Sequence, residues 1–332
     1  MSSSAIGCLP HFLVPYPTPK LLTNSLTKIK LFHTAESQVT SADSRRWTSR
    51  KRTTYSLALQ QAQLLGMEPK KLAITNNHGE KLIGVLRDAG SKELVILCHG
   101  FRASKDHQII LNLANALTSE GISVFHFDFA GNGESEGSFQ YGNYRREADD
   151  LHAVVLHFSG QKREISAIAG HSKGGNVVLL YASVYNDIHT VVNMSGRFAL
   201  DGGIEDRLGK DFMQRIKNDG FIDVKDKTGE VEFRVTEESL MDRLTTDMRA
   251  ASLSINNECR VLTVHGSEDE IIPVSAALEF AKLIPNHKLH IIEGANHGYT
   301  SHQVELSSIV LNFLRTGVQQ GNQSQVEGAN KD

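Results

Sequence analysis

The chain has 332 residues, of which 40% are hydrophobic and 22% are charged, and its formal net charge at pH 7 is -3. These values are typical of a soluble globular protein that buries a sizeable core. The small negative charge, without a basic stripe along a predicted helix, excludes nucleic acid as an expected partner. No apolar run approaches the roughly 18 residues of a membrane span, so we expect no membrane-spanning segment.

The N-terminal segment, residues 1–55, differs in composition from the rest of the chain. It is rich in Ser, Thr and basic residues and contains only two acids, Glu36 and Asp43. Acid-poor, hydroxylated segments are typical of organelle transit peptides, so we expect a disordered transit peptide, a chloroplast location and a plant protein. A disordered extension of a cytoplasmic protein is the alternative.

Between residues 60 and 316, predicted strands and helices alternate. The predicted strands are 70–76, 81–87, 93–98, 122–129, 164–170, 190–195, 259–266 and 288–294, and the predicted helices are 107–121, 144–158, 176–185, 273–284 and 304–314. The first two strands read as a hairpin, and the later ones are short apolar runs typical of buried strands. We therefore expect one α/β domain at 60–316, with a mostly parallel sheet covered by helices on both faces.

Two segments do not fit this alternation. The interval 197–256 mixes helix, turn and short-strand patterns with alternating charges. An insertion between strands of a parallel sheet lies at the edge of the sheet or above it, so we expect a small cap. Residues 317–332 contain too few apolar residues to fold, which predicts a disordered tail.

One short motif predicts a nucleophile. Gly170-His171-Ser172-Lys173-Gly174 follows a predicted strand and opens a predicted helix, which is the context that gives a G-x-S-x-G pattern its meaning. A side chain at either glycine would collide across so tight a turn. The helix N-terminus behind Ser172 favours negative charge that develops nearby.

A serine hydroxyl needs a base, and the base needs an orienting acid. Among fifteen histidines, His297 follows the last predicted strand, and Asp269 follows the strand before it. Both therefore lie at the carboxyl edge of the sheet, where Ser172 also lies. For the acid, Glu268, Glu270 and Asp128 remain alternatives to Asp269. His171 is excluded as the base because the residue before the nucleophile points away from the hydroxyl.

Acyl transfer also needs donors for an oxyanion. The backbone N–H of Lys173 starts the helix beside Ser172, and the N–H of Phe101 follows the strand 93–98, so we expect these two donors. An ordinary strand-ending turn at 99–101 is the alternative. The cysteines at 8, 98 and 259 have no metal-ligand spacing, so they predict no metal site. Acyl transfer through a serine requires neither a metal nor an organic cofactor, so we expect none.

Five stretches in order carry a resemblance to the α/β-hydrolase superfamily, and within it to the serine aminopeptidase S33-like and cinnamoyl- or feruloyl-esterase-like branch. They are HGF at 99–101, FDFAGNGES at 127–135, GHSKGG at 170–175, HGSEDEIIP at 265–273 and GANHGY at 294–299. The resemblance implies an eight-stranded sheet with a cap after the sixth strand. The chain departs from the family at Asn132, often His or Arg, and at Lys173, more usually Met or Gln.

We expect a serine hydrolase that cleaves carboxylic esters of small acyl substrates through Ser172, Asp269 and His297. An aminopeptidase or thioesterase would use the same site, and a small-ligand receptor with slow turnover is an alternative from another class. Lys173 has two interpretations. Its ammonium either pairs with an acid of the cap or faces the acyl pocket and favours an acidic substrate.

Overall fold

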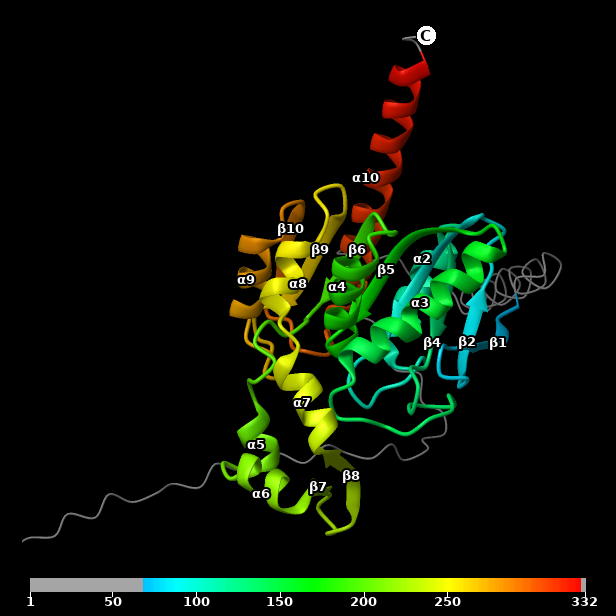
Figure 1. Ribbon diagram of the computed structural model, residues 1–332. Helices are drawn as coiled ribbons and strands as arrows, with labels where there is room; N and C mark the ends of the chain where they lie inside the picture. The colour runs from blue at the N-terminus through cyan, green and yellow to red at the C-terminus, as the bar shows by residue number, and fades with distance from the viewer. Residues whose placement is uncertain (1–67, 330–332) are drawn as a thin grey trace, which may run out of the picture. The chain divides into compact units, whose positions relative to one another are not determined.

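The computed structural model describes residues 68–329, and the side chains of residues 68–316 (Figure 1). The transit peptide expected at 1–55 lies outside the described residues, so this prediction and the chloroplast location remain predictions. Within residues 68–329, no helix is long and apolar enough to cross a membrane.

Eight strands form one sheet in the order β1-β2-β4-β3-β5-β6-β9-β10. β2 pairs antiparallel with β1 and with β4, and every other pair is parallel. Each strand coincides with one predicted from the sequence. The strands are β1 (Lys70–Thr75), β2 (Lys81–Arg87), β3 (Glu93–Cys98), β4 (Ser123–Phe127), β5 (Glu164–His171), β6 (Thr190–Met194), β9 (Arg260–Gly266) and β10 (His287–Ile292).

Helices cover both faces of this sheet (Figure 1). One face packs against α3 (Tyr144–Gly160), α4 (Lys173–Tyr185), α8 (Met248–Ser254) and α9 (Ser275–Leu283), and the other against α2 (Gln108–Ser119) and α10 (Gln303–Ala329). The predicted fold class, a mostly parallel eight-stranded sheet between helices, is confirmed.

β3 illustrates why the central strands read as unbroken apolar runs. Ile96 and Cys98 belong to the core on the α3 and α4 face, whereas Val95 and Leu97 belong to the core on the α2 and α10 face. All four side chains are at most 1% exposed. Since alternate residues of a strand point to opposite faces, both faces of this strand require apolar side chains.

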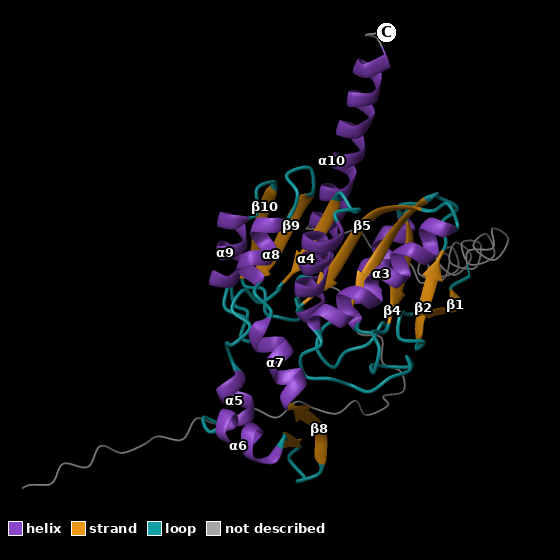
Figure 2. Cartoon of the chain, in the orientation of Figure 1, coloured by secondary structure: helices purple, strands orange, loops and turns teal. Residues whose placement is uncertain are grey.

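Between β6 and β9 the chain forms a cap that lies beyond the carboxyl ends of the parallel strands (Figure 2). The antiparallel pair β7–β8 and three short helices pack around a small separate core that includes Phe233 and Leu240, together with Tyr141 from the loop before α3. The cap elements are α5 (Ile204–Leu208), α6 (Phe212–Asp219), β7 (Phe221–Lys225), β8 (Val231–Thr236) and α7 (Glu237–Thr245).

Two details differ from the sequence-based boundaries. α8 falls inside the interval 197–256, but its Met248 and Ala251 pack in the main core against α4, so it covers the sheet rather than the site. α10 continues to Ala329, past residue 317, where the disordered tail was expected to start. Extending a helix that is already nucleated requires only local hydrogen bonds and no apolar core.

Candidate active site

Ser172 lies on a sharp turn between β5, which ends at His171, and α4, which begins at Lys173. Its backbone has φ 56° and ψ -117°, a conformation that residues other than glycine rarely adopt. A Cβ at Gly170 would lie 2.1 Å from the carbonyl oxygen of Gly174, and one at Gly174 would lie 2.5 Å from that of His99. Only glycine allows these backbone segments to approach so closely, which explains the two glycines around the serine.

Ser172, His297 and Asp269 are joined by hydrogen bonds. His297 Nε2 lies 3.0 Å from Ser172 Oγ, and His297 Nδ1 lies 2.8 Å from Asp269 Oδ2. Because a carboxylate only accepts, Nδ1 carries the proton and donates it, which leaves Nε2 to accept from the serine hydroxyl. The three residues come from the ends of β5, β9 and β10, at one edge of the sheet.

The carboxylate of Asp269 is held ionised by its donors. Its Oδ1 accepts from the backbone N–H groups of Ile271 and Ile272, at 3.0 and 2.8 Å, and its Oδ2 lies 3.2 Å from His265 Nε2. Burial raises the pKa of Asp269, but the hydrogen bonds from His265 and His297 outweigh burial and hold this pKa well below its usual range.

The competing acids lie elsewhere. The Asp128 carboxylate accepts from the buried ammonium of Lys105 at 2.9 Å. Glu270 accepts from the backbone N–H of His297 at 3.1 Å and has no recorded bond to the ring, and Glu268 is exposed. Among these carboxylates, Asp269 alone is hydrogen-bonded to the His297 imidazole.

The two expected oxyanion donors lie beside the serine. A Cβ at Gly100 would be 3.1 Å from Ser172 Cβ, so the loop after β3 packs directly on the turn. Phe101 and Lys173 both line, together with Ser172, a cavity of about 70 Å³. Neither backbone N–H has a hydrogen-bond acceptor among the described residues, which leaves both available to a ligand.

His171 is bound away from the serine hydroxyl. Its Nε2 lies 2.9 Å from the backbone oxygen of His297, and its ring stacks on His107 with centroids 5.9 Å apart. Burial, and then the neighbouring imidazole of His297, lowers the pKa of His171 to about 3. The ring is therefore neutral near pH 7 and buttresses the loop that carries His297.

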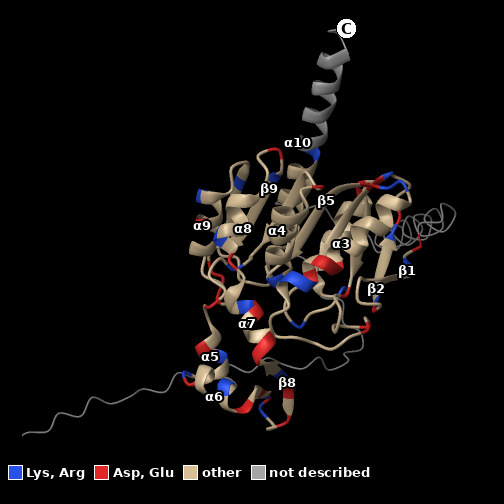
Figure 3. Cartoon of the chain, viewed as in Figure 1, with Lys and Arg blue, Asp and Glu red and all other residues tan. Residues whose placement is uncertain are grey.

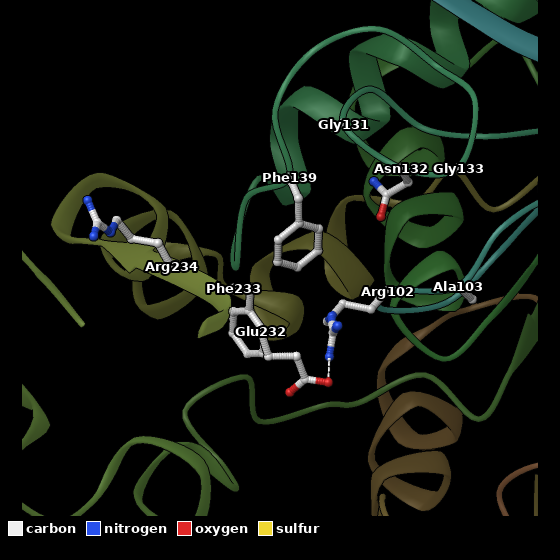
Figure 4. A pocket seen from close by; sticks show the side chains of 9 residues that line it. All are labelled: Arg102, Ala103, Gly131, Asn132, Gly133, Phe139, Glu232, Phe233 and Arg234. Carbon is white, nitrogen blue, oxygen red and sulfur yellow. Dashed lines mark ion pairs between the residues drawn. The ribbon is translucent and has the colours of Figure 1, made fainter. Parts of the chain in front are cut away.

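A second, larger cavity of about 360 Å³ opens between the cap and the loops that follow β3 and β4 (Figure 4). Arg102 lies at its edge in an ion pair with Glu232 of β8, and the Phe139 and Phe233 rings line it. The Phe101 ring packs edge-on against both rings, at 5.4 and 5.8 Å between centroids. Phe101 therefore connects the loop after β3, which packs on the Ser172 turn, to the aromatic core of the cap.

Sequence reasoning missed three residues that line the small cavity, namely Arg197, Arg207 and Arg243. They are spread over the loop after β6 and the cap helices α5 and α7. No spacing or motif links them, so only the folded chain brings them to Ser172.

Comparison with known proteins agrees with the fold. The family model for serine aminopeptidases of the S33 type matches residues 89–218. The structure of Est1E from Butyrivibrio proteoclasticus with bound ferulic acid is 25% identical, covers 75% of this chain and 99% of that one, and superposes with a TM-score of 0.65. Esterase Pf2001 of Pyrococcus furiosus is 24% identical, with 77% and 92% of the two chains covered and a TM-score of 0.58.

A sequence relative is an uncharacterized protein of Saccharomyces cerevisiae. It is 24% identical over 227 residues, which are 62% of this chain and 69% of the yeast protein. The two solved structures thus share their fold with this chain.

Proposed function

We propose that this chain is a serine hydrolase of the α/β-hydrolase superfamily and that it cleaves carboxylic esters of small acyl substrates. The observation that carries the proposal is the unbroken hydrogen-bonded chain from Asp269 through His297 to Ser172. A nucleophile, a base and an orienting acid in this arrangement catalyse acyl transfer on many unrelated folds.

The reaction follows from the geometry. His297 Nε2 takes the proton of Ser172 Oγ while Oγ attacks the ester carbonyl, and Asp269 stabilises the imidazolium that forms. The backbone N–H groups of Phe101 and Lys173 donate to the oxyanion of the tetrahedral intermediate, where one such donor is typically worth about 3 kcal/mol. His297 then protonates the leaving alkoxide, and water, activated by the same base, releases the acid from the acyl-enzyme.

An aminopeptidase would use the same three residues but must also bind a free amine. Two acids of the cap, Glu205 and Asp206, are exposed on α5 and do not line the cavity beside Ser172. No carboxylate from residues 68–316 lines that cavity, whereas three arginines do, and these would repel an ammonium. This observation favours an ester over an aminoacyl amide and leaves a thioester compatible with the site.

The proposal is tested with the purified chain, a fluorophosphonate probe and p-nitrophenyl butyrate. We expect the probe to label Ser172, and Ser172→Ala to lose both labelling and turnover. Ser183→Ala, which changes a serine on the same helix, is the matched control and should keep both. Full activity of the Ser172→Ala protein would refute the proposal. A stoichiometric burst without further turnover would instead support a receptor with slow turnover.

A further inference from the structure

The cavity beside Ser172 is lined by a cluster of arginines. Arg243 of α7 is 7% exposed, Arg197 in the loop after β6 is half-buried, and Arg207 of α5 is exposed. Figure 3 shows both basic and acidic residues on α5, α6, α7 and β8, so the cap as a whole has no single sign of charge. The excess of positive charge is local to this cavity.

No carboxylate among the described residues forms an ion pair with any of the three. Other arginines of the cap do have such partners, since Arg234 pairs with Asp223 at 2.7 Å. Burial, and then the positive charges of Arg243 and Arg207, lowers the pKa of Arg197. Charges of one sign left together at a cavity wall attract a ligand of the opposite sign.

The guanidinium groups are partly fixed and partly free. Arg243 donates to the backbone oxygens of Leu200 and Gly202 at 2.7 and 3.2 Å, which fixes its position. Arg197 donates through Nη2 to Ile271 O at 2.6 Å, and no acceptor for its Nε or Nη1 is recorded among the described residues. The Arg207 side chain forms no hydrogen bond within the described part of the chain and lies over the Phe101 ring at 4.7 Å.

Lys173 does not add to this free charge. Its ammonium lies 2.6 Å from the Glu147 carboxylate, and both side chains are buried. The available cations are therefore the three guanidiniums, whose planar donor forks match the oxygens of carboxylates and phosphates.

We propose that the substrate is an ester that carries a carboxylate or phosphate group beside its scissile bond, and that Arg197, Arg207 and Arg243 bind this anion. The inference rests on the proposed ester hydrolysis at Ser172 and adds the class of substrate. The anion orients the ester so that its carbonyl faces the Ser172 hydroxyl and the two backbone donors.

The kinetic test compares matched substrates. On the acyl side these are p-nitrophenyl hexanoate, the mono-p-nitrophenyl ester of adipic acid, and p-nitrophenyl 6-phosphonohexanoate. On the alcohol side they are phenyl acetate and 3-acetoxybenzoate. We expect at least one anionic ester to exceed its neutral partner about tenfold in kcat/KM, because a charge-assisted bidentate contact is typically worth that factor. The larger of the carboxylate and phosphonate values identifies the preferred anion.

The variants Arg197→Gln and Arg207→Gln should each lower the anionic-to-neutral ratio of kcat/KM by about five- to tenfold. Arg249→Gln, which changes an exposed arginine of α8 outside the cavity, is the matched control and should keep the ratio. An unchanged ratio in both cavity variants, or no preference for any anion in the wild type, would overturn the proposal.

A binding measurement separates this inference from the proposed hydrolysis. In Ser172→Ala, monomethyl adipate should raise the Tm, methyl hexanoate should raise it less, and Arg207→Gln should remove the difference. If Ser172→Ala showed anion-dependent binding while the wild-type protein turned over no ester, ester hydrolysis would be refuted and the anion site supported. If the wild-type protein hydrolysed esters but neither binding nor kcat/KM depended on the anion, the anion site would be refuted and ester hydrolysis supported.

Discussion

The ammonium of Lys173 and the carboxylate of Glu147 lie 2.6 Å apart with only 4% and 6% of their side chains exposed. The Lys173 Nζ also lies 5.1 Å from the centre of the Tyr144 ring. The sequence left two interpretations of this lysine, and the pair favours the structural one, although the acid belongs to α3 and not to the cap. Its backbone N–H faces the site while its side chain ties α4 to α3.

Removing one partner of this pair should destabilise the fold. Lys173→Met leaves the buried Glu147 without its cation, so we expect the free energy of unfolding to fall by about 2–4 kcal/mol. The double variant Lys173→Met with Glu147→Gln should recover most of this loss, because it leaves no buried charge. Urea unfolding measures both. If the double variant were no more stable than the single one, the pair would not account for the loss.

The orienting acid is tested by Asp269→Asn. The amide can donate to Nδ1 of His297 and so favours the tautomer whose Nε2 carries the proton and cannot accept from Ser172. We expect kcat for p-nitrophenyl butyrate to fall about 10³- to 10⁴-fold with the Tm nearly unchanged. Glu270→Gln is the matched control and should lose less than tenfold. A larger loss for Glu270→Gln would reassign the acid.

The turn around Ser172 should tolerate no methyl group. Gly170→Ala would bring a Cβ to 2.1 Å from the Gly174 carbonyl oxygen, so the helix must move away from β5. We expect a loss of at least about 2 kcal/mol in stability and of most activity. Gly160→Ala, at the end of α3, meets nothing within 4 Å and should be neutral or slightly stabilising. Equal effects of both substitutions would contradict this explanation.

Much of the fold could be predicted because its signals are local. Short apolar runs such as residues 93–98 gave the strands, and the glycines at 170 and 174 gave the turn. Because Ser172, Asp269 and His297 each follow a predicted parallel strand, they could then be placed at one edge of the sheet. The arginine cavity could not be predicted, because it depends on how the cap helices are oriented toward Ser172. The Glu147 partner of Lys173 depends on the packing of α3 on α4, which no periodicity encodes.

The protein should begin to lose stability near pH 6.5, which is above the pH at which ordinary carboxylates titrate. Burial lowers the pKa of His99, His126 and His287 to about 4 each, and that of His171 to about 3. Above pH 6.5 these histidines are neutral in both states and contribute nothing. As pH falls from 6.5 toward 4, the unfolded chain binds the protons first, so stability is lost, by up to about 3 kcal/mol for each histidine.

Two buried carboxyls act in the opposite direction, because burial raises the pKa of both Glu147 and Asp150. Burial raises the pKa of Glu147 to about 7, so the folded chain binds this proton first between pH 7 and 4.5 and gains stability there as pH falls. The four histidines outweigh these two carboxyls, and we expect the free energy of unfolding to be smaller at pH 5 than at pH 8. His287→Gln should reduce this difference. An identical pH dependence in the wild type and the variant would contradict the role of His287.

The cap leaves the sheet at the end of β6, which lies between β5, the strand before Ser172, and β9, the strand before Asp269. A change in the length or sequence of residues 200–245 therefore alters the side chains that lie over Ser172 without shifting the register of any strand in the eight-stranded sheet. The bond-breaking groups and the groups that select the substrate can then diverge independently during evolution. Chains with this same sheet can acquire new substrates by exchanging a single contiguous segment.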